Sequence, residues 1–391
     1  MIPIAMPLLG ETEADAARNA VLSGWVSQGP EVGRFETEFA AFVGADHACA
    51  VSNCTTALHL ALLGVGVGPG DEVVTVSHSF IAGANAIRQC GAMPVFVDIE
   101  QSGFNIDPQA VAAALTPRTR AILCVHQIGM PCDMGALMTI ANSFGLPVIE
   151  DAACGAGSEI RIDGAWQKIG RPIGDVVCFS FHPRKVITTG EGGMLTTNRA
   201  DLDAGFRLRR QHGMSVSDTK RHASASVVFE TYPVRGYNYR MTDIQAAIGR
   251  AQLQRLPEIV ARRRELADRY HAATEAMPGL TPPVEPSWAR SNWQSYCVSL
   301  ARGVDQKKLM QRMLDRGVAT RRGIMNVHLE GAYSGLDLTH ALSRSEMARD
   351  RCILLPLYAQ MTDEEQDKVL TVLQEAMSTL QTTPLRQKIK A

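Results

Sequence analysis

The sequence predicts an α/β fold in which a mostly parallel sheet is covered by helices on both faces, followed by a smaller α+β domain. Short apolar runs rich in valine and isoleucine alternate with segments whose apolar residues recur at helical spacing. The runs are nearly continuous, which is typical of parallel strands that are buried on both faces. With 391 residues, of which 46% are hydrophobic and 20% charged, the chain is long enough for a large core and two or three domains.

The predicted elements begin after residue 30. Residues 1–30 are expected to be irregular, with turns at Gly24-Trp25 and Gly29-Pro30. A helix is expected next, because Phe35 and Phe39 recur at helical spacing. Strands are then predicted at 48–51, 72–76, 94–97, 120–126, 147–149, 176–180, 194–197 and 295–300. Helices are predicted from 58 onward and at 80–90, 108–115, 134–144, 243–276, 306–315 and 362–377.

A proline-rich segment at 278–286 marks a change of organisation. The elements after it are shorter and mixed in type. We therefore predict two domains: residues 1–265, which hold an N-terminal arm and the large domain, and residues 266–391, which form a small α+β domain.

Charge and cysteine content argue against several classes of protein. The formal net charge is −1, which gives no electrostatic reason to expect a nucleic-acid or membrane partner. No apolar run approaches the roughly 18 residues that cross a bilayer, and the N-terminus lacks the basic and apolar regions of a signal peptide. The nine cysteines are scattered without a CxxC pair, which predicts free thiols in the cytoplasm and no metal site.

One lysine, Lys185, follows the predicted strand 176–180 and precedes the segment Thr189-Gly190-Glu191-Gly192-Gly193. The glycines allow backbone conformations that other residues avoid, so this lysine is expected to be held in position. By residue type alone it would be an ordinary surface lysine. The residues at the ends of the other strands favour a functional role instead.

Ligands of open α/β sheets bind at the carboxyl ends of the strands, and four kinds of group are predicted there. Strand 48–51 leads to hydroxyls at a helix N-terminus, where free N–H groups bind anions. The other strands supply an aromatic ring, a carboxylate and an amine. The residues at these ends are Thr55, Thr56, Ser79, Phe80, Asp151, Ser180 and Lys185.

Several of these residues also have a simpler interpretation. Thr55 would serve as a helix cap, Phe80 as a core residue and Asp151 as a turn residue. Together, however, a phosphate site, a flat ring, a carboxylate and a lysine are the groups that bind pyridoxal 5'-phosphate (PLP). In such a site the lysine forms a Schiff base with the cofactor, and the carboxylate pairs with the pyridinium nitrogen.

The chain resembles the DegT/DnrJ/EryC1/StrS family of sugar aminotransferases, which have the fold-type-I architecture of aspartate aminotransferase. The resemblance covers nearly the whole chain, and its lysine and aspartate motifs are highly specific. The matching motifs are Ser23-Gly24-Trp25, Phe35-Glu36, Gly70-Asp71-Glu72-Val73, Glu150-Asp151-Ala152-Ala153, Ser180-Phe181-His182 with Lys185, Thr189-Gly190-Glu191-Gly192-Gly193 and Gly236-Tyr237-Asn238-Tyr239-Arg240-Met241.

The resemblance implies roles for individual residues. Lys185 would hold PLP and move the proton, and Asp151 would pair with the ring nitrogen. The implied contacts of the phosphate are Thr55, Thr56 and Ser180, and the implied contact of the ring face is Phe80.

Further residues are implied around the cofactor and the substrate. Asn238 matches an asparagine that reaches the phosphate of the neighbouring subunit, which implies a homodimer with shared active sites. Trp25 and His328 are implied near the sugar. Cys154 stands where the family has glutamine or histidine beside the ring oxygen, and a thiol is a much weaker hydrogen-bonding group. The phosphate segment Asn53-Cys54-Thr55-Thr56 also lacks a glycine that many members have.

The implied activity is transfer of an amino group from L-glutamate to a nucleotide-linked 4-keto-6-deoxyhexose, for a surface polysaccharide or a secondary metabolite. Three alternatives stay open. The first is a PLP-dependent sugar dehydratase, in which histidine replaces the lysine, and Lys185 argues against it. The second is a non-catalytic regulator, whose only basic feature here is Arg262-Arg263-Arg264, interpreted as a solvated helix face or a dimer contact. The third is an aminotransferase for a cyclitol or another non-sugar ketone.

Overall fold

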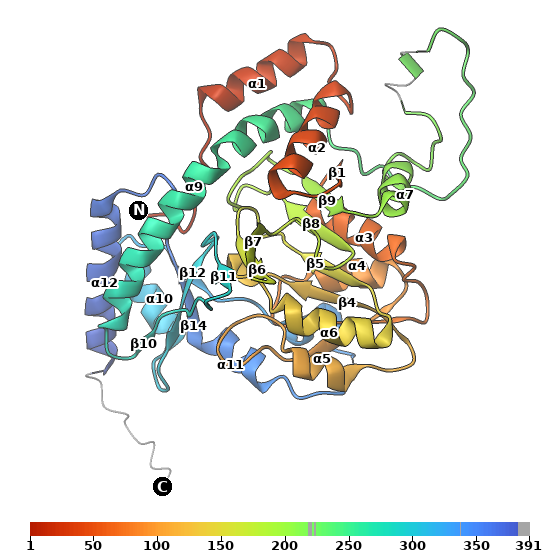
Figure 1. Ribbon diagram of the computed structural model, residues 1–391. Helices are drawn as coiled ribbons and strands as arrows, with labels where there is room; N and C mark the ends of the chain where they lie inside the picture. The colour runs from red at the N-terminus through yellow and green to blue at the C-terminus, as the bar shows by residue number, and fades with distance from the viewer. Residues whose placement is uncertain (218–220, 223, 337, 382–391) are drawn as a thin grey trace.

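The computed structural model describes residues 1–217, 221–222, 224–336 and 338–381, and it confirms the predicted α/β architecture (Figure 1). Within these residues the central sheet has seven strands in the order β1-β9-β8-β5-β4-β2-β3. Neighbours pair in parallel except at β9, which is antiparallel to both β1 and β8. The strands are β1 (His47–Val51), β2 (Glu72–Val76), β3 (Met93–Val97), β4 (Thr119–Val125), β5 (Val148–Asp151), β8 (Val176–Ser180) and β9 (Gly193–Thr197).

Helices cover both faces of the sheet, and the handedness of the chain decides which helix lies on which face. The crossovers through α3 and α4 run toward β3, whereas those through α5 and α6 run back toward β1. Because such crossovers are right-handed, α3 and α4 lie on one face and α5 and α6 on the other (Figure 1). These helices are α3 (Cys54–Gly64), α4 (Ala82–Gln89), α5 (Pro108–Ala114) and α6 (Met134–Phe144).

A smaller lobe has its own sheet, with the strand order β10-β12-β14-β13, and its own hydrophobic core. The long helix α9 (Asp243–Glu275) joins the two lobes. Its residues up to Val260 pack in the core of the large lobe, and Leu266 and Tyr270 pack in that of the smaller one. The domain boundary at residue 265 falls between these two sets and stays a prediction. The other elements of the smaller lobe are β10 (Leu280–Thr281), β12 (Tyr296–Leu300), α10 (Gln306–Asp315), β13 (Arg321–Arg322), α11 (Ser343–Arg351), β14 (Cys352–Leu355) and α12 (Asp363–Gln381).

The start of the chain is helical where the sequence predicted irregular structure. Glu11–Leu22 form α1, so the prediction for residues 1–30 is wrong in this part. The helix buries Glu13 against α9, where Glu13 accepts hydrogen bonds from Gln252 (2.7 Å) and Arg255 (3.0 Å). Tertiary contacts therefore hold α1, and its alanine-rich sequence has no strong apolar stripe that would predict it.

The sequence interpretation also missed several short elements. They lack the long apolar runs and the sustained periodicity that predict strands and helices. In the smaller lobe these are β10, β13, β14 and α11. The others are β6 (Glu159–Ile162), β7 (Ala165–Lys168), β11 (Ala289–Arg290) and α7 (Ala200–Arg210), of which β6, β7 and β11 form a three-stranded sheet.

The interpretation of Arg262-Arg263-Arg264 as a solvated helix face or a dimer contact is wrong for Arg263. That side chain is buried and donates to the main-chain carbonyls of Trp293 (3.1 Å) and Leu357 (3.2 Å). Burial lowers the pKa of Arg263 to about 10. Arg262 and Arg264 each donate to another carbonyl and to acidic side chains. These arginines join α9 to the segments around it.

A buried ion cluster ties α2 (Pro30–Val43) to β1 and to the end of α7. Glu36 of α2 accepts hydrogen bonds from Arg207 (2.6 Å) and from Arg210. Glu36 also accepts from the N–H of Ala50 in β1 at 2.9 Å, and Arg210 donates to the carbonyl of Ala50 at 2.6 Å. Burial alone would raise the pKa of Glu36, but the two guanidiniums lower it below its usual value. The cluster therefore fixes β1 just before the chain enters α3.

We predict that Glu36→Gln lowers the free energy of unfolding by about 3–5 kcal/mol, because the buried Arg210 loses its carboxylate. Urea denaturation at neutral pH measures this change. The neighbouring Thr37 is exposed on α2, so Thr37→Ala serves as the matched control and should change stability by no more than about 0.5 kcal/mol. Equal losses from the two variants would contradict the role of the cluster.

Candidate active site

The carboxyl ends of β1, β2, β5 and β8 meet at one edge of the central sheet, and the loops after them form the candidate site. The loop that carries Lys185 leaves β8 and returns to β9. Two main-chain hydrogen bonds close this loop. The N–H of Phe181 donates to the carbonyl of Gly192 at 2.9 Å, and the N–H of Thr189 donates to the carbonyl of Phe181 at 3.0 Å. The N–H of Lys185 donates to the carbonyl of His182 at 2.8 Å. The backbone around the lysine is thus fixed from both sides.

The side chain of Lys185 reaches the loop that follows β5. Its Nζ lies 3.2 Å from Sγ of Cys154. Burial alone would lower the pKa of Lys185, but Cys154 and the carboxylate of Asp151 raise it above its usual value. Both neighbouring groups therefore favour the protonated form of this amine.

Strand β5 ends in two buried carboxylates, Glu150 and Asp151, which point to opposite faces of the sheet. Glu150 has a full set of partners. Its Oε1 accepts from the N–H groups of Ile173 (3.0 Å) and Gly174 (2.8 Å), and its Oε2 lies 3.1 Å from Nε2 of His126. This carboxylate holds β5 to the neighbouring segments and is not open to a ligand.

Asp151 has far fewer partners. Its Oδ1 accepts from the N–H of Ala153 at 2.9 Å and lies 4.0 Å from the thiol of Cys54. Its Oδ2 has no hydrogen bond within the described part of the chain. Burial raises the pKa of Asp151, and the Ala153 N–H and the Lys185 amine offset this only in part. Because a buried carboxylate needs positive charge nearby, Asp151 is suited to a cationic N–H donor at Oδ2.

The N-terminus of α3 lies beside Asp151 and offers an anion site. Asn53, and not Thr55, caps this helix, since Oδ1 of Asn53 accepts from the N–H of Thr56 at 2.9 Å. The hydroxyl of Thr56 donates to the carbonyl of Asn53 at 2.7 Å, whereas the hydroxyl of Thr55 has no partner among the described residues. A Cβ on Gly193 would lie 2.5 Å from the carbonyl carbon of Asn53, so only glycine lets β9 approach this closely.

Ser180 and Phe80 lie at the ends of β8 and β2. Ser180 is buried, and its Oγ accepts from the N–H of His182 at 3.4 Å. Phe80 follows β2 in the turn before α4, and 68% of its surface is exposed. An exposed ring at the ligand-binding edge of a sheet is available to stack on a flat group.

Asn238 lies in a segment that runs beside the end of β1. Its backbone pairs with Gln211, and the next residue, Tyr239, accepts from the N–H of Ser52 at 2.9 Å. The rings of Tyr237 and Tyr239 are stacked 4.9 Å apart, which stiffens the segment. The Asn238 side chain itself is exposed.

The two residues implied near the sugar, Trp25 and His328, have their polar and ring contacts with residues other than Lys185 in the described part of the chain. Trp25 packs edge-on against His222, with 5.2 Å between the ring centres. His328 is buried, and both of its ring nitrogens have partners: Nδ1 lies 2.6 Å from Oγ of Ser77, and Nε2 lies 3.3 Å from Glu346. Their proposed roles stay predictions.

Two side chains that the sequence interpretation missed hold the backbone on either side of the Lys185–Cys154 contact. Asn292 donates from Nδ2 to the carbonyl of Cys154 at 2.7 Å. Gln294 donates from Nε2 to the carbonyl of Arg184. Nothing in the sequence places residues 291–294 beside loops more than 100 residues earlier. The available signal is that Asn292 and Gln294 belong to a polar cluster directly before the predicted strand 295–300.

Taken together, these groups fit PLP. An amine in a closed loop suits covalent attachment of a cofactor aldehyde. A buried carboxylate with a free oxygen suits the N–H of a pyridinium ring, and a helix N-terminus with a free hydroxyl suits a phosphate. Among the described residues, no group of His, Cys, Asp and Glu could hold a metal ion. No described helix is long and apolar enough to cross a membrane.

Comparison with known proteins agrees with this fit. The model of the DegT/DnrJ/EryC1/StrS aminotransferase family matches residues 7–374. The spore coat polysaccharide biosynthesis protein SpsC of Bacillus subtilis is 38% identical over 384 residues, which are 96% of each chain.

Solved structures share the whole fold. The aminotransferase TlmJ of Streptoalloteichus hindustanus superimposes with a TM-score of 0.89 at 35% identity, over 97% of this chain and 100% of its own. Spr1654 of Streptococcus pneumoniae, assigned as a sugar aminotransferase, superimposes in its PMP-form with a TM-score of 0.89 at 26% identity, over 97% and 100% of the two chains. It also has a PLP-form.

We predict that neutralising the two carboxylates of β5 has opposite effects on the cofactor-free protein. Asp151→Asn should raise the free energy of unfolding at neutral pH by about 0.5–2 kcal/mol, because it removes a poorly partnered buried charge. Glu150→Gln should lower it by about 1–3 kcal/mol, because an amide cannot accept all the hydrogen bonds that the carboxylate accepts.

The pH dependence of the first effect follows from the raised pKa of Asp151. The protonated carboxyl stabilises the folded state fully below the ordinary aspartate pKa, and this contribution is lost as the pH rises through the raised pKa. The gain from Asp151→Asn should therefore grow with pH. Urea unfolding between about pH 4 and about pH 8 measures it, and a gain that falls with pH would refute this account.

Proposed function

Because the chain belongs to the DegT/DnrJ/EryC1/StrS aminotransferase family and is a PLP-dependent aminotransferase, we propose that it transfers an amino group from L-glutamate to a keto sugar. The sugar we propose is a nucleotide-linked 4-keto-6-deoxyhexose, used for a surface polysaccharide or a secondary metabolite. The observation that carries the proposal is the Lys185 amine, 3.2 Å from Cys154 in the loop after Asp151. The names of SpsC and Spr1654 support the sugar class.

The chain's own residues would divide the work as follows. PLP, when bound, supplies an electron sink that no side chain offers. Lys185 would hold it and, once the substrate has displaced the lysine, move a proton to and from the substrate. The Asp151 carboxylate would keep the ring nitrogen protonated through a charge-assisted hydrogen bond. Thr55, Thr56 and Ser180 would bind the phosphate together with the N–H groups at the start of α3.

The remaining predicted residues would position the ring and the sugar. Phe80 would cover one face of the ring, and Cys154 would lie beside its oxygen. Trp25 would contact the sugar. Since both ring nitrogens of His328 are already bonded, His328 would contact the sugar through its ring edge rather than by a new hydrogen bond.

The alternatives are less well supported. A sugar dehydratase would have histidine in place of Lys185, and the nearby His182 is engaged locally, since its Nδ1 accepts from the N–H of Arg184 at 3.2 Å. A DNA-binding regulator would need a basic face, whereas Arg263 is buried against carbonyls. A cyclitol ketone stays open, and assays with a nucleotide-linked keto sugar and with a keto-inositol as amino acceptors distinguish the two substrate classes.

We also propose a homodimer with shared active sites. Figure 1 shows the described residues from 224 onward in the connection between α7 and α9 extending away from the body of the chain. They include Val227 and Phe229, which are 85% and 88% exposed. Apolar side chains exposed to this degree are typical of a surface that a partner covers, and a second copy of this chain is the proposed partner. The predicted cytoplasmic location is kept as part of the proposal, and all nine cysteines are free thiols.

We predict that Lys185→Ala lowers the rate of transamination by at least about 10²–10⁴-fold, because the proton-transfer group is lost. The measurement is formation of 2-oxoglutarate from L-glutamate by the PLP-loaded enzyme. Lys307→Ala, which alters an exposed lysine, is the control and should keep full activity. Borohydride treatment of the holoenzyme should add the mass of reduced PLP to Lys185 and to no other residue. A fully active Lys185→Ala variant would overturn the proposal.

Mixing two inactive variants tests whether Asn238 acts on the neighbouring subunit. If Asn238 acts on the neighbouring subunit, a hybrid dimer of one Lys185→Ala chain and one Asn238→Asp chain has one site with both defects and one site with none. Unfolding and refolding an equal mixture should restore about a quarter of wild-type activity, since half of the dimers are hybrids with one intact site. No recovery in confirmed hybrids would show that Asn238 acts within its own subunit.

A further inference from the structure

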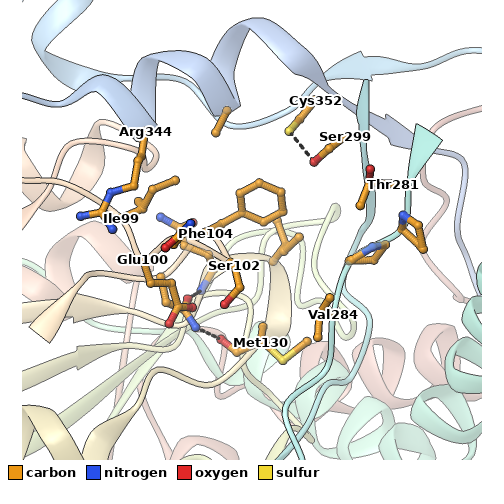
Figure 2. Close-up of a pocket in the computed structure, with 18 of the residues that line it drawn as sticks. Ile99, Glu100, Ser102, Phe104, Met130, Thr281, Val284, Ser299, Arg344 and Cys352 are labelled. Carbon is orange, nitrogen blue, oxygen red and sulfur yellow. Dashed lines mark hydrogen bonds between the residues drawn. The ribbon is translucent and has the colours of Figure 1, made fainter. Parts of the chain in front are cut away.

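A separate cavity of about 610 Å³ lies between the two lobes. None of the residues assigned to the active site lines it. Figure 2 shows side chains from both lobes around it, with the ring of Phe104 pointing into the space. The labelled residues of the large lobe include Glu100, Phe104 and Met130, and those of the smaller lobe include Thr281, Val284 and Ser299. Its volume falls within the range of small-molecule sites, roughly 300–1,000 Å³.

The cavity is mostly apolar, and its aromatic and aliphatic walls include Phe104, Met130, Trp293 and Leu300. Such a lining favours a ligand with an aromatic or aliphatic body over a sugar or an ion. Polar side chains such as Ser102, Thr281 and Ser299 also line the cavity. The charged ones, Glu100, Arg344 and Arg351, decide which charge on a ligand is accepted.

Two arginines line the cavity, and only one is neutralised. Arg344 donates to Asp107 at 2.6 Å and lies 3.6 Å from Asp98. Arg351, the last residue of α11, has no hydrogen bond or ion pair within the described part of the chain. An unpaired guanidinium beside apolar walls is a recognition group for a carboxylate.

The acidic residue of the lining, Glu100, opposes this charge less than an ordinary glutamate would at neutral pH and below. Burial, and then the carboxylates of Asp133 and Asp107, raise its pKa to about 7, although Arg344 acts in the opposite direction. A large fraction of Glu100 is therefore uncharged near neutral pH. Of the two lining arginines, Arg351 is therefore the one whose charge is not offset by an ion pair within the described residues.

We propose that this cavity binds an amphipathic monoanion, with an aromatic or aliphatic body between the lobes and one carboxylate on Arg351. Binding of this kind is independent of the proposed sugar reaction, because it needs neither PLP nor either substrate. It would act on the enzyme through the wall that the cavity shares with the active site.

That shared wall is the segment 291–294. Ser291 and Trp293 line the cavity, and the residues that alternate with them hold the active-site loops. Asn292 donates to the carbonyl of Cys154, and Gln294 donates to the carbonyl of Arg184. Trp293 has a φ of 49°, in the left-handed region that few residues other than glycine adopt. A ligand that shifts Trp293 would therefore shift both anchors of the Lys185–Cys154 contact.

Calorimetric titration of the PLP-loaded enzyme with 1-naphthaleneacetate tests the proposal, with uncharged 1-naphthaleneacetamide as the matched probe. Wild-type enzyme should bind one acid per chain and bind the amide about 10–100-fold more weakly, since only the acid pairs with Arg351. Arg351→Met should bind acid and amide with equal, weak affinity. Arg302→Met, which alters an exposed arginine outside the cavity, should behave as wild type.

Two more readouts complete the test. Ala348→Phe fills the cavity and should abolish binding of both probes. Saturation with the acid should shift the visible absorbance of bound PLP in wild-type enzyme. No saturable binding, or an acid affinity that Arg351→Met leaves unchanged, would overturn the site. Saturable binding without a spectral shift would overturn its connection to the cofactor. Because the acid–amide comparison uses unaltered enzyme, it holds even if Ala348→Phe fails to fold.

Discussion

The structure depends on one carboxylate, Asp151, that is buried at the end of β5 with too few partners. A buried charge costs several kcal/mol unless positive charge and hydrogen bonds meet it. Its neighbour Glu150 shows the usual solution, with two N–H donors and a histidine. Around Asp151 the fold supplies the N-terminus of α3 and the amine of Lys185, but no partner for Oδ2 among the described residues. In the proposed function a cationic ring nitrogen would complete the set, and cofactor binding would then be linked to folding stability.

Both lobes build this arrangement. The strands of the large lobe bring Asp151, Lys185 and the start of α3 to one edge, because their carboxyl ends meet there. The smaller lobe then fixes the two loops that meet in the Lys185–Cys154 contact, through Asn292 and Gln294. Arg263 of α9 in turn holds the carbonyl of Trp293 between them. The Lys185–Cys154 contact is thus supported by side chains from the smaller lobe, although both of its own residues belong to the large lobe.

Much of the fold and the core of the site follow from sequence, because their causes are local. Buried strands and amphipathic helices leave periodic patterns, and the ends of parallel strands must share an edge. The proximity of Lys185 to the loop after Asp151 follows from that rule. The errors have tertiary causes. α1 is held by contacts with α9, and Arg263 is buried against carbonyls from distant segments. Asn292 and Gln294 were missed because no local pattern encodes a contact across more than 100 residues.

The segment 291–294, which supports the active-site loops, is also the route by which a ligand in the cavity would affect them. Since Trp293 lines the cavity while Asn292 and Gln294 hold the loops of Cys154 and Arg184, a rearrangement on either side would reach the other through one short segment. Coupling between two binding equilibria is reciprocal. If filling the cavity alters how tightly the cofactor is held, then loading the cofactor must alter affinity in the cavity by the same factor. The left-handed φ of 49° places backbone strain at Trp293, between the two anchors, so this is the residue through which the proposed coupling would act. In this proposal the residues 291–294 are the physical connection between the cavity and Lys185.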